Sequence, residues 1–214
     1  MSAVAHIKQY KTGIFYADEF RGDISWNGYE HNVLLRNEGV DAEGKLKFTD
    51  IGMAVGADDD KDGRGMAIAD FDNDGALDIV INNNPGDSGI QARARATLLH
   101  NNVGNRHNWL AVELRGTKSN CDGVGAVVRI EIGQEQQMRL VSAGSGYASQ
   151  SSERLYFGLG DHDQISTMTV RWPSGLVERF QNLKAKQLIR ITEGAGVEVL
   201  TLPARRAAAV RTNA

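Results

Sequence analysis

An acidic loop at residues 70–78 constrains this chain more than any other feature, and it reads Asp-Phe-Asp-Asn-Asp-Gly-Ala-Leu-Asp. Its aspartates stand at the first, third, fifth and ninth positions, and a glycine stands at the sixth. Carboxylates about 4 Å apart repel one another by several kcal/mol when the effective dielectric constant is about 20. An ordered loop of this kind therefore requires a cation, and oxygen ligands at alternate positions around a central glycine are typical of calcium.

The spacing assigns a calcium ligand to each inward-facing position of the loop. Gly75 permits the sharp bend that a side chain would obstruct. The expected ligands are side-chain oxygens of three aspartates, one backbone carbonyl and a fourth aspartate, completed by water: Asp70, Asp72, Asp74, Ala76 through its carbonyl, and Asp78. We therefore expect Ca²⁺ as the cofactor, in a structural role. The alternative is a solvated acidic turn, which the flanking apolar strands make less favoured.

Composition excludes several classes of protein. The 214 residues are 41% hydrophobic, which is enough for one large or two small domains. A net charge of −3 and the lack of a basic stripe with interleaved aromatics argue against nucleic-acid binding. One cysteine excludes an internal disulfide, and no apolar run approaches the length of a membrane span. The first residues lack the apolar core of a secretory signal, so we expect a cytoplasmic chain as written, or a piece of a longer chain with a signal upstream.

Short apolar runs separated by turn residues predict an all-β fold. In the first half, strands near 32–36, 47–49, 66–69 and 77–82 suit one four-stranded blade of a propeller-like sheet. In the second half, longer runs alternate between apolar and polar residues, which favours a β-sandwich packed against the blade. The expected organisation has four parts: an N-terminal extension at 1–31, the blade and the start of a second at 32–104, the sandwich at 105–202, and a tail at 203–214.

Two parts of the sequence resemble known families. Residues 65–83, which contain the acidic loop, resemble the FG-GAP/VCBS repeat. The segments His107-Asn-Trp-Leu-Ala-Val, Asp122-Gly-Val-Gly-Ala, Gly144-Ser-Gly-Tyr, Phe157-Gly-Leu-Gly and Val170-Arg-Trp-Pro-Ser-Gly resemble the ASPIC/UnbV domain in order and spacing. The resemblance implies a calcium-stabilised recognition or adhesion protein, mostly secreted in this family, in which the domain follows several blades.

Polar residues in two loops of the second half are candidates for binding a ligand. Loops of a sandwich that display tyrosine, amides and carboxylates can bind sugars or small polar molecules. The candidate residues are Lys118, Asn120, Asp122, Tyr147, Ser149 and Gln150. Trp172 belongs to the same polar and aromatic set, with the alternative that Tyr147 and Trp172 are core or rim aromatics.

The sequence leads to two hypotheses of different classes. The first is an interaction module, stabilised by calcium, that binds a protein, a carbohydrate or a small polar ligand without catalysis. The alternative is a cytoplasmic natural-product tailoring enzyme, similar to a cyclase, that uses the cleft between blade and sandwich. Self-association through an unpaired blade edge is a further possibility.

Overall fold

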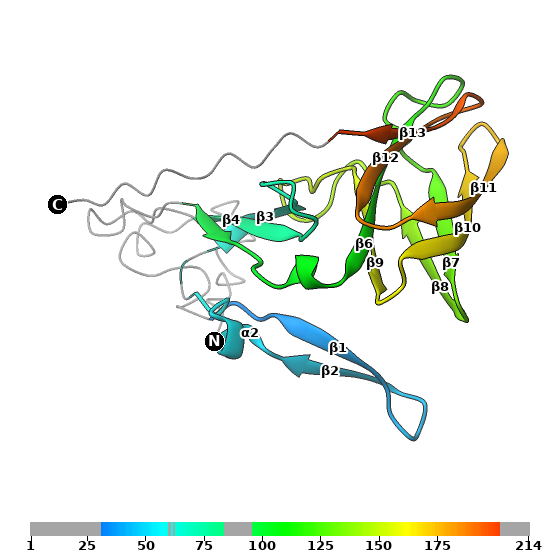
Figure 1. Ribbon diagram of the computed structural model, residues 1–214. Coiled ribbons are helices and arrows are strands. Elements are labelled where there is room, and N and C mark those ends of the chain that lie inside the picture. The colour runs from blue at the N-terminus through cyan, green and yellow to red at the C-terminus, as the bar shows by residue number, and fades with distance from the viewer. Residues whose placement is uncertain (1–30, 60, 62, 84–95, 202–214) are drawn as a thin grey trace. The chain divides into compact units, whose positions relative to one another are not determined.

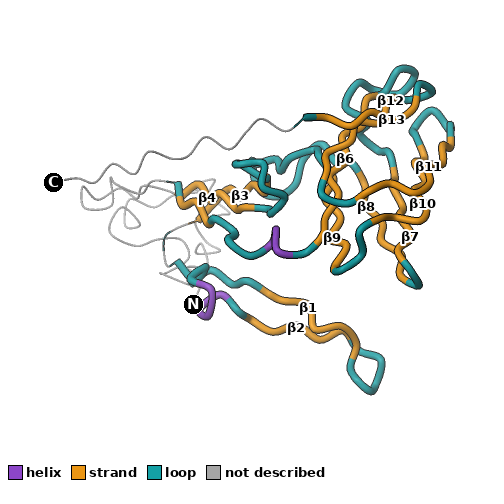
Figure 2. The backbone as a smooth tube through the Cα atoms, in the orientation of Figure 1, coloured by secondary structure: helices purple, strands orange, loops and turns teal. Residues whose placement is uncertain are grey.

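The computed structural model describes residues 31–59, 61, 63–83 and 96–201. These residues form strands and loops, with two short helical turns at α2 (Gly52–Val55) and η2 (Gly104–Arg106) (Figure 2). The expectation of an all-β fold is confirmed. No helix in this part of the chain is long and apolar enough to cross a bilayer. The expected extension at 1–31 and tail at 203–214 lie almost wholly outside the described residues.

The chain divides into two compact units, and the acidic loop belongs to the second. The second unit comprises residues 67–79 together with the chain from residue 100 onward. The first unit comprises the described residues up to 66 and from 80 to 99.

Two four-stranded sheets make up most of the second unit (Figure 1). Sheet I has the order β13-β12-β6-β9, and sheet II has the order β11-β10-β7-β8. The bounds of the strands are β6 (Asn108–Arg115), β7 (Val127–Ile132), β8 (Glu135–Leu140), β9 (Leu155–Gly160), β10 (Gln164–Arg171), β11 (Val177–Lys184), β12 (Gln187–Thr192) and β13 (Gly196–Leu200). All neighbouring strands are antiparallel except β6 and β12, which pair in parallel from Gln187 opposite Leu110 to Thr192 opposite Arg115.

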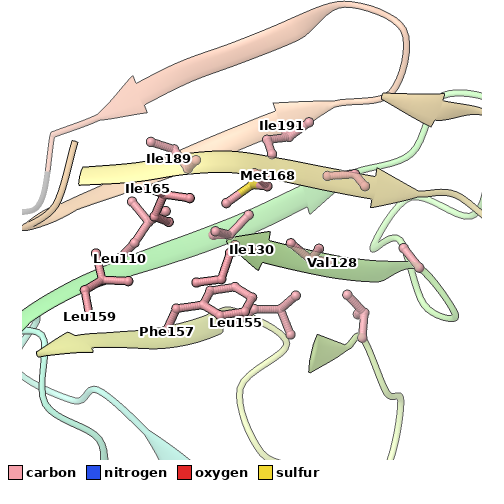
Figure 3. Packing of buried hydrophobic residues seen from close by; sticks show 14 of the residues in the cluster. Leu110, Val128, Ile130, Leu155, Phe157, Leu159, Ile165, Met168, Ile189 and Ile191 are labelled. Carbon is pink, nitrogen blue, oxygen red and sulfur yellow. The ribbon is translucent and has the colours of Figure 1, made fainter. Parts of the chain in front are cut away.

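A single hydrophobic core lies between the two sheets. Sheet I contributes side chains such as Leu110, Phe157 and Ile189, and sheet II contributes Ile130 and Met168 (Figure 3). These five side chains are fully buried, and burial of an aliphatic or aromatic side chain contributes about 1.5–3 kcal/mol each. The apolar positions of the alternating pattern therefore form the inner face of each sheet. The polar positions lie on the two outer faces.

The outer face of sheet I is also partly apolar. Trp109 and Ala111 of β6 and Leu188 of β12 form a second, smaller buried cluster, against which Tyr156 and Leu200 pack. Since successive residues of a strand face opposite sides, Trp109 and Leu110 belong to different clusters. The part of this outer face around Trp109 is thus buried, although it lies outside the main core.

The strands of the first half differ from the expected four-stranded blade. β1 (Leu35–Val40) and β2 (Leu46–Asp50) form a two-stranded antiparallel sheet, while β3 (Gly63–Ala69), β4 (Asp78–Asn83) and β5 (Thr97–Leu99) form a separate sheet of order β3-β4-β5. The described residues contain no closed propeller.

Asp50 explains why the β1–β2 hairpin stops where it does. Its Oδ1 accepts hydrogen bonds from the amides of Leu34, at 3.3 Å, and Gly52, at 2.9 Å. These bonds close the base of the hairpin and begin α2, so the chain turns into a helical segment instead of adding another strand directly to β2.

Candidate metal centre

The acidic loop is folded by its own carboxylates. Asp70 accepts hydrogen bonds from the amides of Asp74, at 3.0 Å, and Gly75, at 2.9 Å, and Asp74 accepts one from the amide of Ala76 at 2.9 Å. Asn73 and Gly75 have positive φ angles of 56° and 92°, which an asparagine and a glycine tolerate at low cost. The tight turn expected from the sequence is therefore present and is held by side-chain to backbone bonds.

The structure brings three of the predicted ligands together. Asp70, Asp72 and Asp74 each offer a carboxylate oxygen, and these three oxygens lie within 4.8 Å of one another. A second group with the same limit contains Asp72, Asp78 and His100, so Asp72 belongs to both groups. An oxygen-rich set of this kind suits a hard cation such as Ca²⁺.

The fourth aspartate has a different environment. Asp78 is 1% exposed, and its carboxylate accepts hydrogen bonds from the amides of Phe71, at 3.2 Å, and Asn101, at 2.8 Å. It therefore ties the two ends of the loop to the segment that follows β5. Ala76 is buried as well, at 2% exposure.

Two polar residues of the segment after β5 contact the loop carboxylates, and sequence reasoning does not find either. The Nε2 atom of His100 lies 3.2 Å from Oδ2 of Asp72, and this hydrogen bond raises the pKa of His100. Asn105 Nδ2 donates to Oδ2 of Asp74 at 2.7 Å. Both residues stand more than 25 positions from their partners, so no local spacing pattern signals them.

The loop lies on the outer face of sheet I. A Cβ atom added to Gly75 would lie 2.0 Å from Cε2 of Trp109, so the indole occupies the space beside this glycine. The Tyr156 hydroxyl donates to Oδ2 of Asp70 at 3.2 Å. Burial raises the pKa of Tyr156 to about 12, and burial also raises the pKa of Asp70 despite the hydrogen bonds that its carboxylate accepts.

A row of alternating charges on the same face ends at the loop; we call it the charge ladder, and its members are Glu198, Arg190, Glu113 and Arg154. The nitrogen to oxygen distances along it are 3.2 Å, 3.0 Å and 2.8 Å. Arg154 also donates to Oδ1 of Asn73 at 3.1 Å and to the Tyr156 hydroxyl at 3.2 Å. The guanidinium group of Arg154 therefore connects the loop to a row of charged side chains on β6, β12 and β13.

The strand that precedes the loop is attached to the sandwich by two further hydrogen bonds. The Ile68 amide donates to Oγ of Ser151 at 3.2 Å, and the Ser152 amide donates to the Ile68 carbonyl at 2.9 Å. The acidic loop and the end of β3 that leads into it are thus both hydrogen-bonded to the sandwich.

Half of the loop residues predicted to bind a ligand form hydrogen bonds within their own loops. The Asn120 side chain donates to the Val124 carbonyl and accepts from the Val124 amide, at 2.8 and 2.7 Å. Ser149 donates to the Ser145 carbonyl, and Gln150 donates to Glu153. Tyr147 is 76% exposed, and Lys118 and Asp122 are exposed. Trp172 is buried at 1%, so it is a core residue, and its Nε1 donates to Glu178 at 2.6 Å.

Glu193 organises the loop that contains Lys118 and Asn120. Its buried carboxylate accepts hydrogen bonds from the amides of Thr117, Lys118 and Ser119 at 2.7–2.8 Å. Burial opposes ionisation of this carboxyl, but the amide of Ser119, the hydroxyl of Ser174 and the neighbouring amides lower the pKa of Glu193 to about 2. The carboxylate is therefore an internal structural anion, which sequence reasoning does not identify.

Comparison with known proteins supports the domain assigned to the second half. Residues 116–198 match the family model described as ASPIC and UnbV. The chain is 34% identical to cartilage acidic protein 1 of Xenopus tropicalis over 159 residues, which is 74% of this chain and 23% of that protein. It is 33% identical to cartilage acidic protein 1 of Homo sapiens and of Mus musculus over 114 residues, which is 53% of this chain. The chain thus spans less than a quarter of the length of these relatives.

The family match covers only one of the two resemblances predicted from the sequence. The resemblance to ASPIC/UnbV is confirmed for residues 116–198. The resemblance of residues 65–83 to an FG-GAP/VCBS repeat stays a prediction, because the family match begins after that segment.

Proposed function

We propose that this part of the protein is an interaction module in which a calcium ion bound by the 70–78 loop fixes that loop to the outer face of sheet I. The observation that carries the proposal is the convergence of Asp70, Asp72 and Asp74, whose oxygens lie within 4.8 Å of one another on a hydrogen-bonded turn. Asp78 and the Ala76 carbonyl would complete the protein ligands, with water in the remaining positions.

The surroundings of the loop fit a bound cation. Carboxylates this close repel one another, and partial burial of Asp70 strengthens the repulsion because the local dielectric is lower than in water. Asn105 and Tyr156 each donate a hydrogen bond to a loop carboxylate, which orients the remaining oxygens. Such outer contacts commonly determine how well a metal site is formed.

The consequence of binding would be mechanical. An ion that neutralises the loop holds Gly75 against Trp109 and Asn73 against Arg154, so the loop and the charge ladder become one rigid surface. The free energy of calcium binding then adds to the stability of the fold, by about 2.7 kcal/mol when the free ion is at 100 times its dissociation constant. We assign the ion no catalytic step.

The recognition part of the proposal rests on the family match over residues 116–198 and on the similarity to cartilage acidic protein 1. The described contacts of the loop carboxylates are with amides, an asparagine, a histidine and a tyrosine, which position them. The partner would be a protein or a carbohydrate.

Thermal unfolding in calcium and in chelator tests the calcium site. We expect a higher melting temperature with CaCl₂ than with EGTA, and we expect Asp72→Asn and Asp74→Asn to abolish the difference. Asp122→Asn is the matched control, since it removes an exposed carboxylate of the same unit outside the loop. Identical melting curves of the unmodified protein in calcium and in chelator would refute the proposed site.

A further inference from the structure

The outer face of sheet II carries an unusual arrangement of side chains. The residues that alternate with the buried Val128 and Ile130 of β7 point to this outer face, and the same holds on the neighbouring strands. The strand register sorts the face into three rows across β11, β10, β7 and β8: Gln181, Thr167, Glu131 and Gln136; Arg179, Thr169, Arg129 and Met138; Val177, Arg171, Val127 and Leu140.

Three arginines surround one threonine in this pattern. Arg129 and Arg179 stand directly opposite Thr169 on its two neighbouring strands, and Arg171 follows two positions later on its own strand. Directly opposed Cα atoms lie about 4.5–5.5 Å apart, and residues two apart on a strand lie about 6.8 Å apart. Side chains as long as arginine can therefore reach a common position above Thr169.

These arginines are available to an external anion. All three are exposed, and no ion pair of the described residues includes any of them. The guanidinium group presents a planar fork of donors that matches sulfate or carboxylate oxygens. Three of them on one surface of a chain with net charge −3 mark a local basic site. We call these three residues with Thr169 the arginine face.

The row beside the arginine face indicates the kind of anion. It contains two glutamines, one threonine and one glutamate, which are hydrogen-bonding groups suited to hydroxyls. Three exposed apolar side chains lie on the two edge strands of the sheet: Met138 and Leu140 on β8, and Val177 on β11. They can pack against the carbon–hydrogen surfaces of sugar rings. An acidic peptide would instead use strand edges, where its backbone hydrogen bonds can be satisfied.

We propose that the arginine face binds a sulfated polysaccharide chain lying across β11, β10, β7 and β8. Sulfate groups would lie against Arg129, Arg171 and Arg179, and sugar hydroxyls would contact the adjoining polar row. The face is on sheet II, while the acidic loop covers sheet I, so binding does not require calcium. This site deepens the proposed recognition function but is independent of the metal.

Titration with a fluorescently labelled heparin octasaccharide at low ionic strength tests the proposal on the whole chain. We expect saturable binding that weakens with added salt, and Arg129→Gln and Arg179→Gln should each raise the dissociation constant by about threefold to tenfold. Arg115→Gln is the matched control, because Arg115 is exposed on sheet I of the same unit, and it should leave binding unchanged. Unaltered melting temperatures would establish that the variants fold.

Several results would overturn the proposal. Absence of saturable binding would refute the site. An equal loss in Arg115→Gln and Arg129→Gln would indicate attraction by overall charge. Undiminished binding of a desulfated octasaccharide would show that the sulfate groups are not recognised, and equal binding of polyglutamate of matched charge would assign the face to another polymer. Binding that disappears in EGTA would assign the effect to the acidic loop.

Discussion

The indole of Trp109 occupies the place that a side chain on Gly75 would need, with Cε2 only 2.0 Å from the position of an added Cβ. Trp109 lies in β6, the first strand of the sandwich, and Gly75 is the sixth residue of the acidic loop. The glycine thus serves two purposes. It permits the positive φ angle of the turn, and it lets the loop backbone approach an aromatic ring on sheet I.

Gly75→Ala is expected to destabilise the protein by about 2–4 kcal/mol, because it adds overpacking against Trp109 to the cost of a positive φ angle. Gly175→Ala separates the two causes. Gly175 has nearly the same φ angle, 91° against 92°, but an added Cβ meets nothing within 4 Å. Urea unfolding followed by tryptophan fluorescence gives both values, and equal losses in the two variants would contradict the close approach.

Tyr156→Phe is expected to weaken calcium binding by about tenfold, because the hydroxyl that donates to Asp70 is lost while the ring remains. Tyr147→Phe is the control, since Tyr147 is 76% exposed and its hydroxyl makes none of the hydrogen bonds described for the loop carboxylates. Calorimetric titration with CaCl₂ measures both constants. An unchanged constant in Tyr156→Phe would show that the hydroxyl does not orient the carboxylate.

Arg154→Met keeps the aliphatic stem but removes the guanidinium that joins Glu113, Asn73 and Tyr156. The expected loss of stability is about 1–3 kcal/mol, since charged hydrogen bonds of a partly buried network are broken. Arg36→Met removes an exposed pair with Glu38 and should cost less than about 1 kcal/mol. Chemical denaturation of the two variants compares these losses, and a greater effect of Arg36→Met would be inconsistent with the charge ladder.

Glu193→Gln should reduce stability at neutral pH and alter its dependence on acid. The folded pKa of Glu193, about 2, lies below the ordinary value of 4.5, so the carboxylate contributes fully above pH 4.5. That contribution is lost as the pH falls from 4.5 through about 2. The unmodified protein should therefore approach the variant in melting temperature as the solution is acidified.

Glu135→Gln provides the reference for this comparison, because Glu135 is exposed on β8. It should melt like the unmodified protein at every pH. A difference between Glu193→Gln and the unmodified protein that stays constant from pH 7 to pH 2 would refute the shifted pKa.

The sequence predicts those features that depend on local periodicity. The alternation of apolar residues along runs such as 126–132 and 187–191 predicts the sandwich, and the loop at 70–78 has the expected tight turn. Trp172 belongs to the core, as one of the two sequence interpretations holds. The calcium ion and the ligand of the loops at 118–122 and 147–150 stay predictions.

Features that depend on distant contacts or on broken periodicity escape sequence reasoning. His100, Asn105 and Tyr156 reach the loop only because the chain folds back onto it. The strand β11 lacks a regular alternation for another reason. Asn182 has a positive φ angle of 54° and is left out of the ladder with β10, so Phe180 and Leu183, three apart, both pack against the core.

The parallel pairing of β6 with β12 has a consequence for the order of assembly. Leu110 and its partner Gln187 are separated by most of the sandwich sequence, so sheet I lacks a central strand until the ribosome has released the last part of the domain. All four strands of sheet II precede β12 in the chain. The strands of sheet II can therefore pair during synthesis, before sheet I is complete and covers their apolar face. The slow step of folding is expected to be the late insertion of β12 beside β6.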